Sequence, residues 1–192
     1  MLTTLMLLAA LGWASPAAGD GDYPADITPP PGTQYPCALT ALPRTLTGVP
    51  EAERGYVNGV YGQVIRGIHA KLLVLTALAG NDSSERGAAL SRYFAATDAV
   101  ATRIGGLPAP AGLEPFRDDV VAALRLQRTF FEKAVEARRS GGSMDDVWRI
   151  AEGRQASGRL IAAWGRMQAR YPQWSRETSD SVYHHLCALD LF

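Results

Sequence analysis

Hydrophobic residues recur at intervals of three and four along most of the chain after residue 50, with polar residues between them. This is the spacing of one face of an α-helix, and no stretch of comparable length alternates with the period of two that a half-buried strand shows. Seven of the twelve prolines lie between residues 24 and 50. The pattern therefore predicts an extended, proline-rich arm over 20–49 and a helical region over 50–192.

Breaks in the pattern divide the helical region into four long segments and one short one. The expected helices cover about 50–79, 82–104, 115–139, 143–171 and 176–189. Four helices of similar length with short connections predict an all-α fold, an antiparallel up-and-down four-helix bundle with a short C-terminal fifth helix. We expect residues 50–192 to form a single domain.

Capping patterns mark several of the expected helix starts. Asp82 with Glu85, and Ser143 with Asp146, have the three-residue spacing of a capping box. Ser175 is the expected N-cap of the last helix. These positions fix where the helices begin more closely than the hydrophobic spacing does.

The first nineteen residues have the pattern of a secretory signal peptide. An apolar run from Leu5 to Trp13 is followed by small residues, with cleavage expected near 17–19. No Lys or Arg precedes the run, so either the signal is atypical or the true start lies upstream. We expect an exported protein, periplasmic or secreted, with no stable membrane anchor after cleavage.

The expected export determines how the two cysteines are interpreted. Cys37 and Cys187 are the only cysteines of the chain, and thiols in oxidising compartments pair where geometry allows. We predict an intramolecular disulfide between them. Free thiols, an intermolecular bridge and metal ligation are the alternatives.

Charge and motifs narrow the function classes. Lys plus Arg and Asp plus Glu number 19 each, so no summed field attracts nucleic acid, and no nucleic-acid partner is expected. The sequence contains no Gly-x-Ser-x-Gly, His-Glu-x-x-His, phosphate-binding loop or dinucleotide fingerprint. The acidic pairs at 118–119 and 145–146 lie in first helical turns, where the helix dipole accounts for them.

Polar residues interrupt or edge the hydrophobic stripes at a similar height in each expected helix. They are Lys71, Asp98, Gln127, Arg154 and Ser157. In alternating helices they form one polar layer, a candidate site for a small anionic ligand, because buried charges need partners. The alternative is that long side chains at the stripe edge reach solvent. An enzyme site at Lys71, Asp98 and Arg154 is a third hypothesis.

A glycine groove lies on the back of the first helix, opposite its hydrophobic stripe. Gly55, Gly59 and Gly62 fall within about sixty degrees of each other on a helical wheel. Glycine there costs helix stability, so close packing by the arm, an additional helix or a second subunit is one explanation. A bias of codon usage is the other.

Histidine and methionine offer only weak ligand candidates. His184 and Cys187 are three apart, whereas His185 points about a hundred degrees away from His184. The chain has no Cys-x-x-Cys-His for covalent haem. His69, Met167, His184 and His185 remain as weak metal or haem ligands, and no cofactor is expected.

These observations favour an exported, non-catalytic binding or interaction protein, whose partner is an unknown small ligand or a protein. The alternative is a periplasmic metal- or haem-binding bundle that uses the histidines and Met167.

Overall fold

The computed structural model describes residue 42, residues 46–79 and residues 83–190. These residues form six helices and no strand, which confirms the all-α prediction. The helices are α1 (Glu51–Ala79), α2 (Ser83–Gly106), α3 (Glu114–Arg139), α4 (Met144–Trp148), α5 (Ala151–Arg170) and α6 (Arg176–Leu189). The predicted signal peptide, Cys37 and the capping residue Asp82 lie outside the described residues.

Two of the predicted caps are present. Ser143 Oγ accepts a hydrogen bond from the backbone N–H of Asp146, whose carboxylate in turn accepts the backbone N–H of Ser143 at 2.8 Å. Ser175 Oγ accepts the N–H of Thr178 at 3.2 Å. Both pairings satisfy N–H groups that have no partner within their own helix.

The helix predicted over 143–171 is two helices. Arg149 ends α4 with hydrogen bonds from its N–H to the carbonyls of Asp145 and Asp146. Ile150 then has extended backbone angles, φ −61° and ψ 116°, and α5 begins after it. Val147 and Ile150 belong to the same hydrophobic cluster, so their three-residue spacing gives no sign of the break between them.

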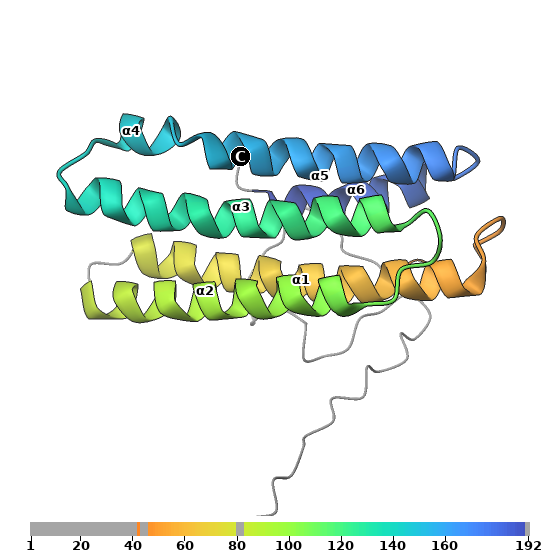
Figure 1. Cartoon of the computed structure of the whole chain (residues 1–192), viewed down its shortest axis with the longest axis horizontal. Coiled ribbons are helices and arrows are strands. Elements are labelled where there is room, and N and C mark those ends of the chain that lie inside the picture. Colours follow the sequence, from red (N-terminus) through yellow and green to blue (C-terminus); the bar gives the residue numbers. More distant parts are fainter. Residues whose placement is uncertain (1–41, 43–45, 80–82, 191–192) are drawn as a thin grey trace, which may run out of the picture.

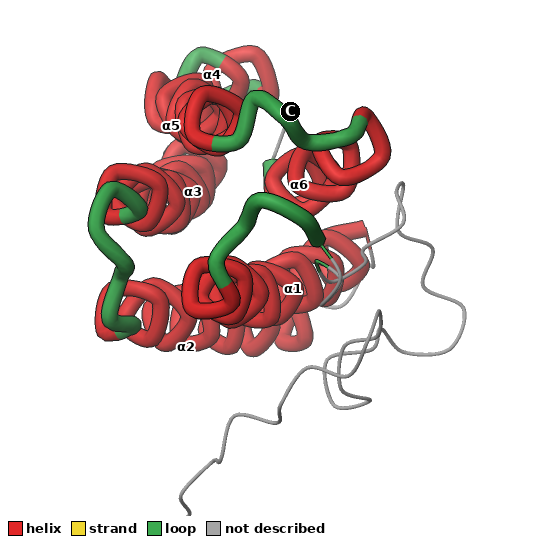
Figure 2. Tube along the Cα trace, turned by 90° about the vertical axis from the view of Figure 1, so that its right-hand side faces the viewer, coloured by secondary structure: helices red, strands yellow, loops and turns green. Residues whose placement is uncertain are grey.

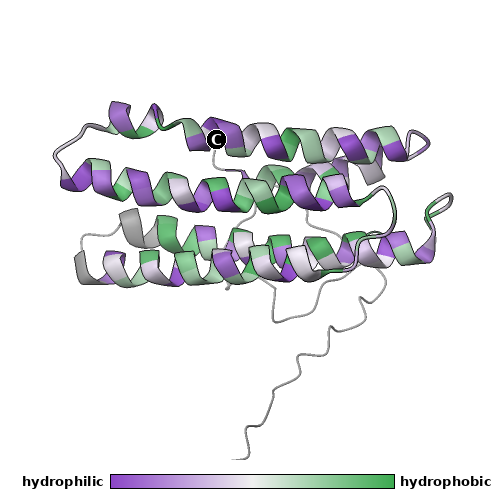
Figure 3. Ribbon diagram, viewed as in Figure 1, coloured by the Kyte–Doolittle hydropathy of each residue, from purple (hydrophilic) through white to green (hydrophobic). Residues whose placement is uncertain are grey.

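The long helices surround a common core, and α6 is part of that arrangement. Packed neighbours follow the order α1, α2, α3, α5 and α6, and α6 also packs on α1. The end-on view shows this order, with α6 between α5 and α1 (Figure 2). Along each helix hydrophobic and hydrophilic residues alternate in short steps (Figure 3), as amphipathic helices require.

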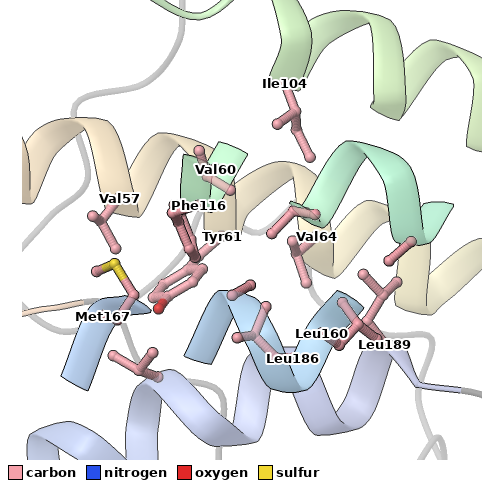
Figure 4. Close-up of a cluster of buried hydrophobic side chains, with 14 of the residues drawn as sticks. Val57, Val60, Tyr61, Val64, Ile104, Phe116, Leu160, Met167, Leu186 and Leu189 are labelled. Atoms are coloured by element: carbon pink, nitrogen blue, oxygen red, sulfur yellow. The ribbon is translucent and has the colours of Figure 1, made fainter. Parts of the chain in front are cut away.

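Two hydrophobic clusters fill the interior. The larger one contains Tyr61, Phe116, Met167 and Leu186, drawn from four helices (Figure 4). The smaller one, with Val74 and Phe131, joins the end of α1 to α2, α3 and α4. Each large apolar side chain buried in this way contributes about 1.5–3 kcal/mol to folding before entropy is counted. Among the residues that the structure describes, no helix has the length and apolar character needed to span a membrane.

Candidate functional site

Three of the five predicted polar-layer residues meet at the C-terminal end of α6. Lys71 Nζ donates hydrogen bonds to the backbone carbonyl oxygens of Ala188, at 2.7 Å, and of Asp190. Gln127 Nε2 donates to the carbonyl oxygen of Leu189 at 2.9 Å. Lys71 of α1 and Gln127 of α3 thus donate to the carbonyl oxygens of three consecutive residues, 188–190.

Helix α5 adds the third side chain. Ser157 Oγ donates a hydrogen bond to Asp190 Oδ1 at 2.6 Å. We call Lys71, Gln127, Ser157 and Asp190 the α6 cap. The last carbonyls of a helix lack donors within the helix and carry the negative end of its dipole, so an ammonium group and an amide are suitable partners for them.

Lys71 is buried and still bears a charge at neutral pH. Its exposed fraction is 8%. Burial lowers the pKa of Lys71 to about 8, against the smaller raising effects of Asp190 and Cys187. The charge of this lysine is directed at the α6 cap, where its donors are used in holding the helix end.

The other two residues of the predicted layer lie elsewhere. Asp98 forms a surface ion pair with Arg128, whose Nε is 2.9 Å from Asp98 Oδ1. Arg128 also contacts Glu132. Arg154 is exposed on α5. The structure therefore brings together Lys71, Gln127 and Ser157, and not Asp98 or Arg154.

The glycine groove of α1 is open within the described part of the chain. A Cβ placed on Gly55 or Gly62 would meet no atom within 4 Å. One placed on Gly59 would lie 3.8 Å from the side chain of Leu107, an ordinary contact distance. No described backbone packs closely against these three glycines.

His185 is a core residue. Its ring is fully buried and stacks on Tyr61, with ring centroids 4.3 Å apart. Nδ1 lies 2.7 Å from the carbonyl oxygen of Ser181. Burial lowers the pKa of His185 to about 4, so the ring is neutral at neutral pH. Met167 is also buried and points toward Val57 and Tyr61 (Figure 4).

The remaining ligand candidates are spread over the fold. His69 is half-buried on α1, and His184 is half-buried beside Tyr183 on α6. Cys187 is exposed on α6. No group of three His, Cys, Asp or Glu in the described ranges could hold a metal ion. Because Cys37 lies outside those ranges, the disulfide stays a prediction.

Asp119 is a buried charge that the sequence interpretation missed. Its exposed fraction is 2%, and its two carboxylate oxygens contact Arg159 Nη1 at 2.9 Å and Arg166 Nε at 2.6 Å. The pairing joins α3 to α5. Two features of the sequence could have indicated this pairing. Asp119 lies four residues before Ala123, on the buried face of α3, and Arg159 and Arg166 are seven residues apart, on one face of α5.

The pairing of Glu53 was likewise not predicted from the sequence. Arg170 Nη2 lies 2.6 Å from Glu53 Oε1, and the hydroxyl of Tyr171 donates to Glu53 Oε2. Arg170 also donates to the carbonyl of Ala111 at 3.1 Å. The hydrogen bond from Arg170 is the main cause that lowers the pKa of Glu53, opposed by burial. The cluster connects the start of α1, the end of α5 and the loop before α3.

No protein-family model matches this sequence, and neither the curated proteins nor the solved structures contain a match.

Proposed function

We propose that this chain is an exported, non-catalytic interaction protein. The observation that carries the proposal is the use made of its buried polar groups. Lys71 and Gln127 bind backbone carbonyls of α6, and Asp119 binds two arginines of α5. Buried polar groups that are paired in this way stabilise the fold. This pairing favours a function in recognition at the surface over a reaction in the interior.

We further propose that α1, α2, α3 and α5 form an antiparallel up-and-down bundle in one domain. The short connections between successive helices support it. The ion pair between Glu53, near the start of α1, and Arg170, at the end of α5, supports this topology, because in an up-and-down bundle the fourth helix ends where the first begins.

The proposed interaction surface lies on α5 and α6. Ile161 and Tyr183 have exposed fractions of 62% and 42%, and the Tyr183 ring packs against Trp164 at 5.3 Å between centroids. Gly158 and Gly165 lie one turn on either side of Ile161, and a Cβ on either would meet nothing within 4 Å. We call these five residues the α5–α6 face.

The expected partner is a protein that presents an amphipathic helix with acidic residues beside its apolar stripe. Glycine at 158 and 165 lets a second helix approach closely, and Ile161 supplies an apolar contact. Arg154 lies one turn before Gly158 and is exposed, so it favours acidic side chains on the partner.

Site-specific photo-crosslinking tests this proposal. A photoreactive residue at position 161 or 183 of the exported full chain should give one discrete adduct with a second protein. The same residue at Arg92, exposed on α2, is the matched control and should give none. Equal labelling at all three positions, or an adduct only with a second copy of this chain, would contradict a specific protein partner.

A blocking substitution separates binding from folding. Gly165→Leu fills the open space on α5 and should raise helix stability by about 1 kcal/mol while abolishing the adduct from position 183. Gly87→Leu on α2 has the same open surroundings and should leave the adduct intact. An undiminished adduct in Gly165→Leu would remove α5 from the interaction surface.

A further inference from the structure

Asp119 holds two arginines of α5 by one nitrogen each. Its Oδ1 accepts a hydrogen bond from Arg159 Nη1 at 2.9 Å, and its Oδ2 accepts one from Arg166 Nε at 2.6 Å. Within the described part of the chain, neither arginine side chain has another hydrogen-bond or ion-pair partner. The two contacts therefore leave donors of both guanidinium groups unused.

The unused donors form two complete carboxylate-binding edges. A guanidinium presents five N–H donors in a rigid fork, and two parallel N–H groups match the two oxygens of a carboxylate. Arg159 keeps the pair on Nε and Nη2, and Arg166 keeps the pair on Nη1 and Nη2. The side chains of Arg159 and Arg166 are 55% and 49% exposed, whereas that of Asp119 is 3% exposed. A ligand can thus reach the arginines from solvent, while Asp119 lies covered beneath them.

The two edges lie closer together than the backbone positions of their residues. Arg159 and Arg166 are seven residues apart, about 10 Å along α5, but their guanidinium groups converge on the two oxygens of one carboxylate. Two acidic side chains one turn apart on a helix have Cβ atoms about 5–6 Å apart. That spacing suits convergent guanidinium groups better than a spacing of two turns does.

The surroundings leave positive charge for a ligand to neutralise. The single carboxylate of Asp119 balances only one of the two guanidinium charges. Glu152 is the only acidic residue of α5, and it pairs with Lys133. Arg154 is exposed on the same helix and has no ion-pair partner among the described residues. The exposed side of α5 is therefore basic, and electrostatic complementarity favours an acidic partner.

The position of the arginines relates them to the α5–α6 face. Gly158 and Gly165 immediately precede Arg159 and Arg166, so each arginine lies about 100° round the helix from its glycine. Ile161 lies on the other side of the glycines, about 40–60° from them. A helix packed over the two glycines therefore has Ile161 beside one flank and the two arginines beside the other.

We propose that Arg159 and Arg166 bind two carboxylates of the partner helix that lie one turn apart, with each carboxylate accepting two N–H groups from one arginine. The inference rests on the proposed interaction surface and adds the acidic pattern that the partner carries, two acidic residues three or four positions apart. Asp119 is a positioning residue. It fixes both guanidinium groups before the partner binds, which reduces the entropy lost on binding.

The adduct from position 161 supplies the probe that tests this pattern. The crosslinked segment of the partner is identified by mass spectrometry and synthesised as a peptide, and its dissociation constant for the full chain is measured. We expect two acidic residues three or four positions apart in the segment. Their replacement by glutamine should weaken binding about tenfold or more, because bidentate charge-assisted pairs are lost. A segment without such a pair, or one that binds through a phosphoryl group, overturns the inference.

Arg159→Lys combined with Arg166→Lys separates the paired donors from charge. Lysine keeps the charge and can pair with Asp119, but it cannot offer two parallel N–H groups, so the dissociation constant should rise about tenfold. Arg92→Lys combined with Arg139→Lys, at exposed positions of α2 and α3, is the matched control and should leave the constant unchanged. If the lysine variant does not fold, Asp119→Asn with Arg159→Gln and Arg166→Gln buries no unpaired charge and should bind more weakly still.

The outcomes distinguish this inference from the proposed function. Equal dissociation constants for wild type and the variants at 159 and 166 would overturn the role of the arginines and leave the α5–α6 face as the interaction surface. The absence of any adduct from position 161 or 183 of the otherwise unchanged chain would overturn both.

Discussion

His185 of α6 and Tyr61 of α1 stack nearly parallel in the core, with ring planes 9° apart. The stacked histidine is fully buried. Burial is the main cause that lowers its pKa to about 4; the Ser181 carbonyl opposes it and the neighbouring His184 adds to it. The contact between α6 and α1 therefore depends on a neutral ring.

Stability should fall in acid because of this histidine. The folded pKa of about 4 lies below the ordinary value of 6.5. Between these values the unfolded chain binds a proton that the folded chain does not, so the free energy of unfolding falls as pH falls from about 6.5 to 4. The loss attributable to His185 is roughly 3 kcal/mol.

Denaturant unfolding of wild type and His185→Phe between pH 7.5 and 4 measures this loss. Phenylalanine keeps a flat ring against Tyr61 and does not titrate, so the variant should show a shallower decline. Glu53, whose pKa is also lowered, loses its stabilising charge in acid in both proteins and cancels in the difference. Parallel curves would mean that folding does not lower the pKa of His185.

Asp119 should be far more important for stability than its position in an acidic pair suggests. Asp119→Asn removes the charge between Arg159 and Arg166 while keeping the shape. Hydrogen bonds to charged groups contribute about 1.5–3 kcal/mol each, and asparagine retains part of one. We expect a loss of about 2 kcal/mol in the free energy of unfolding, measured by urea denaturation at pH 7.

Asp98→Asn is the matched control for that measurement. Asp98 of α2 also pairs with an arginine of another helix, Arg128 of α3, but the Asp98 side chain is 56% exposed. Exposed ion pairs contribute about 0–1 kcal/mol. If Asp119→Asn lowers the free energy of unfolding by no more than Asp98→Asn does, burial of the carboxylate adds nothing to the stabilisation by its ion pairs.

The helices could be predicted from the sequence because their determinants are local. Ser143 and Ser175 act on the turns next to them, and α4 and α6 begin there as expected. The break at Ile150 leaves the three-residue spacing intact, so no pattern reveals it.

The site was predictable only in part. Helical wheels place Lys71, Gln127 and Ser157 at a similar height, and the structure brings them to one end of α6. Their partners are mainly backbone carbonyls, which leave no mark in a sequence. Asp119 was missed because its ion pairs depend on which faces of α3 and α5 meet.

Lys71 should make stability rise with pH in the alkaline range. Its folded pKa of about 8 lies below the ordinary value of 10.5. Between these values the unfolded chain holds a proton that the folded chain has released, so the free energy of unfolding increases from about pH 8 to 10.5. Lys71→Met should lack this contribution, and the difference between the two proteins should grow with pH.

At pH 7 the same variant tests the role of the α6 cap. Methionine relieves the burial of a charge but leaves the carbonyls of Ala188 and Asp190 without their donor, so the net change in unfolding free energy should stay within about 2 kcal/mol. Backbone amides at 186–190 should exchange with solvent faster, because the helix end frays. Lys133→Met, which removes a surface partner of Glu152, should leave their exchange unchanged. Unchanged exchange in Lys71→Met would mean that Gln127 and Ser157 hold α6 without the lysine.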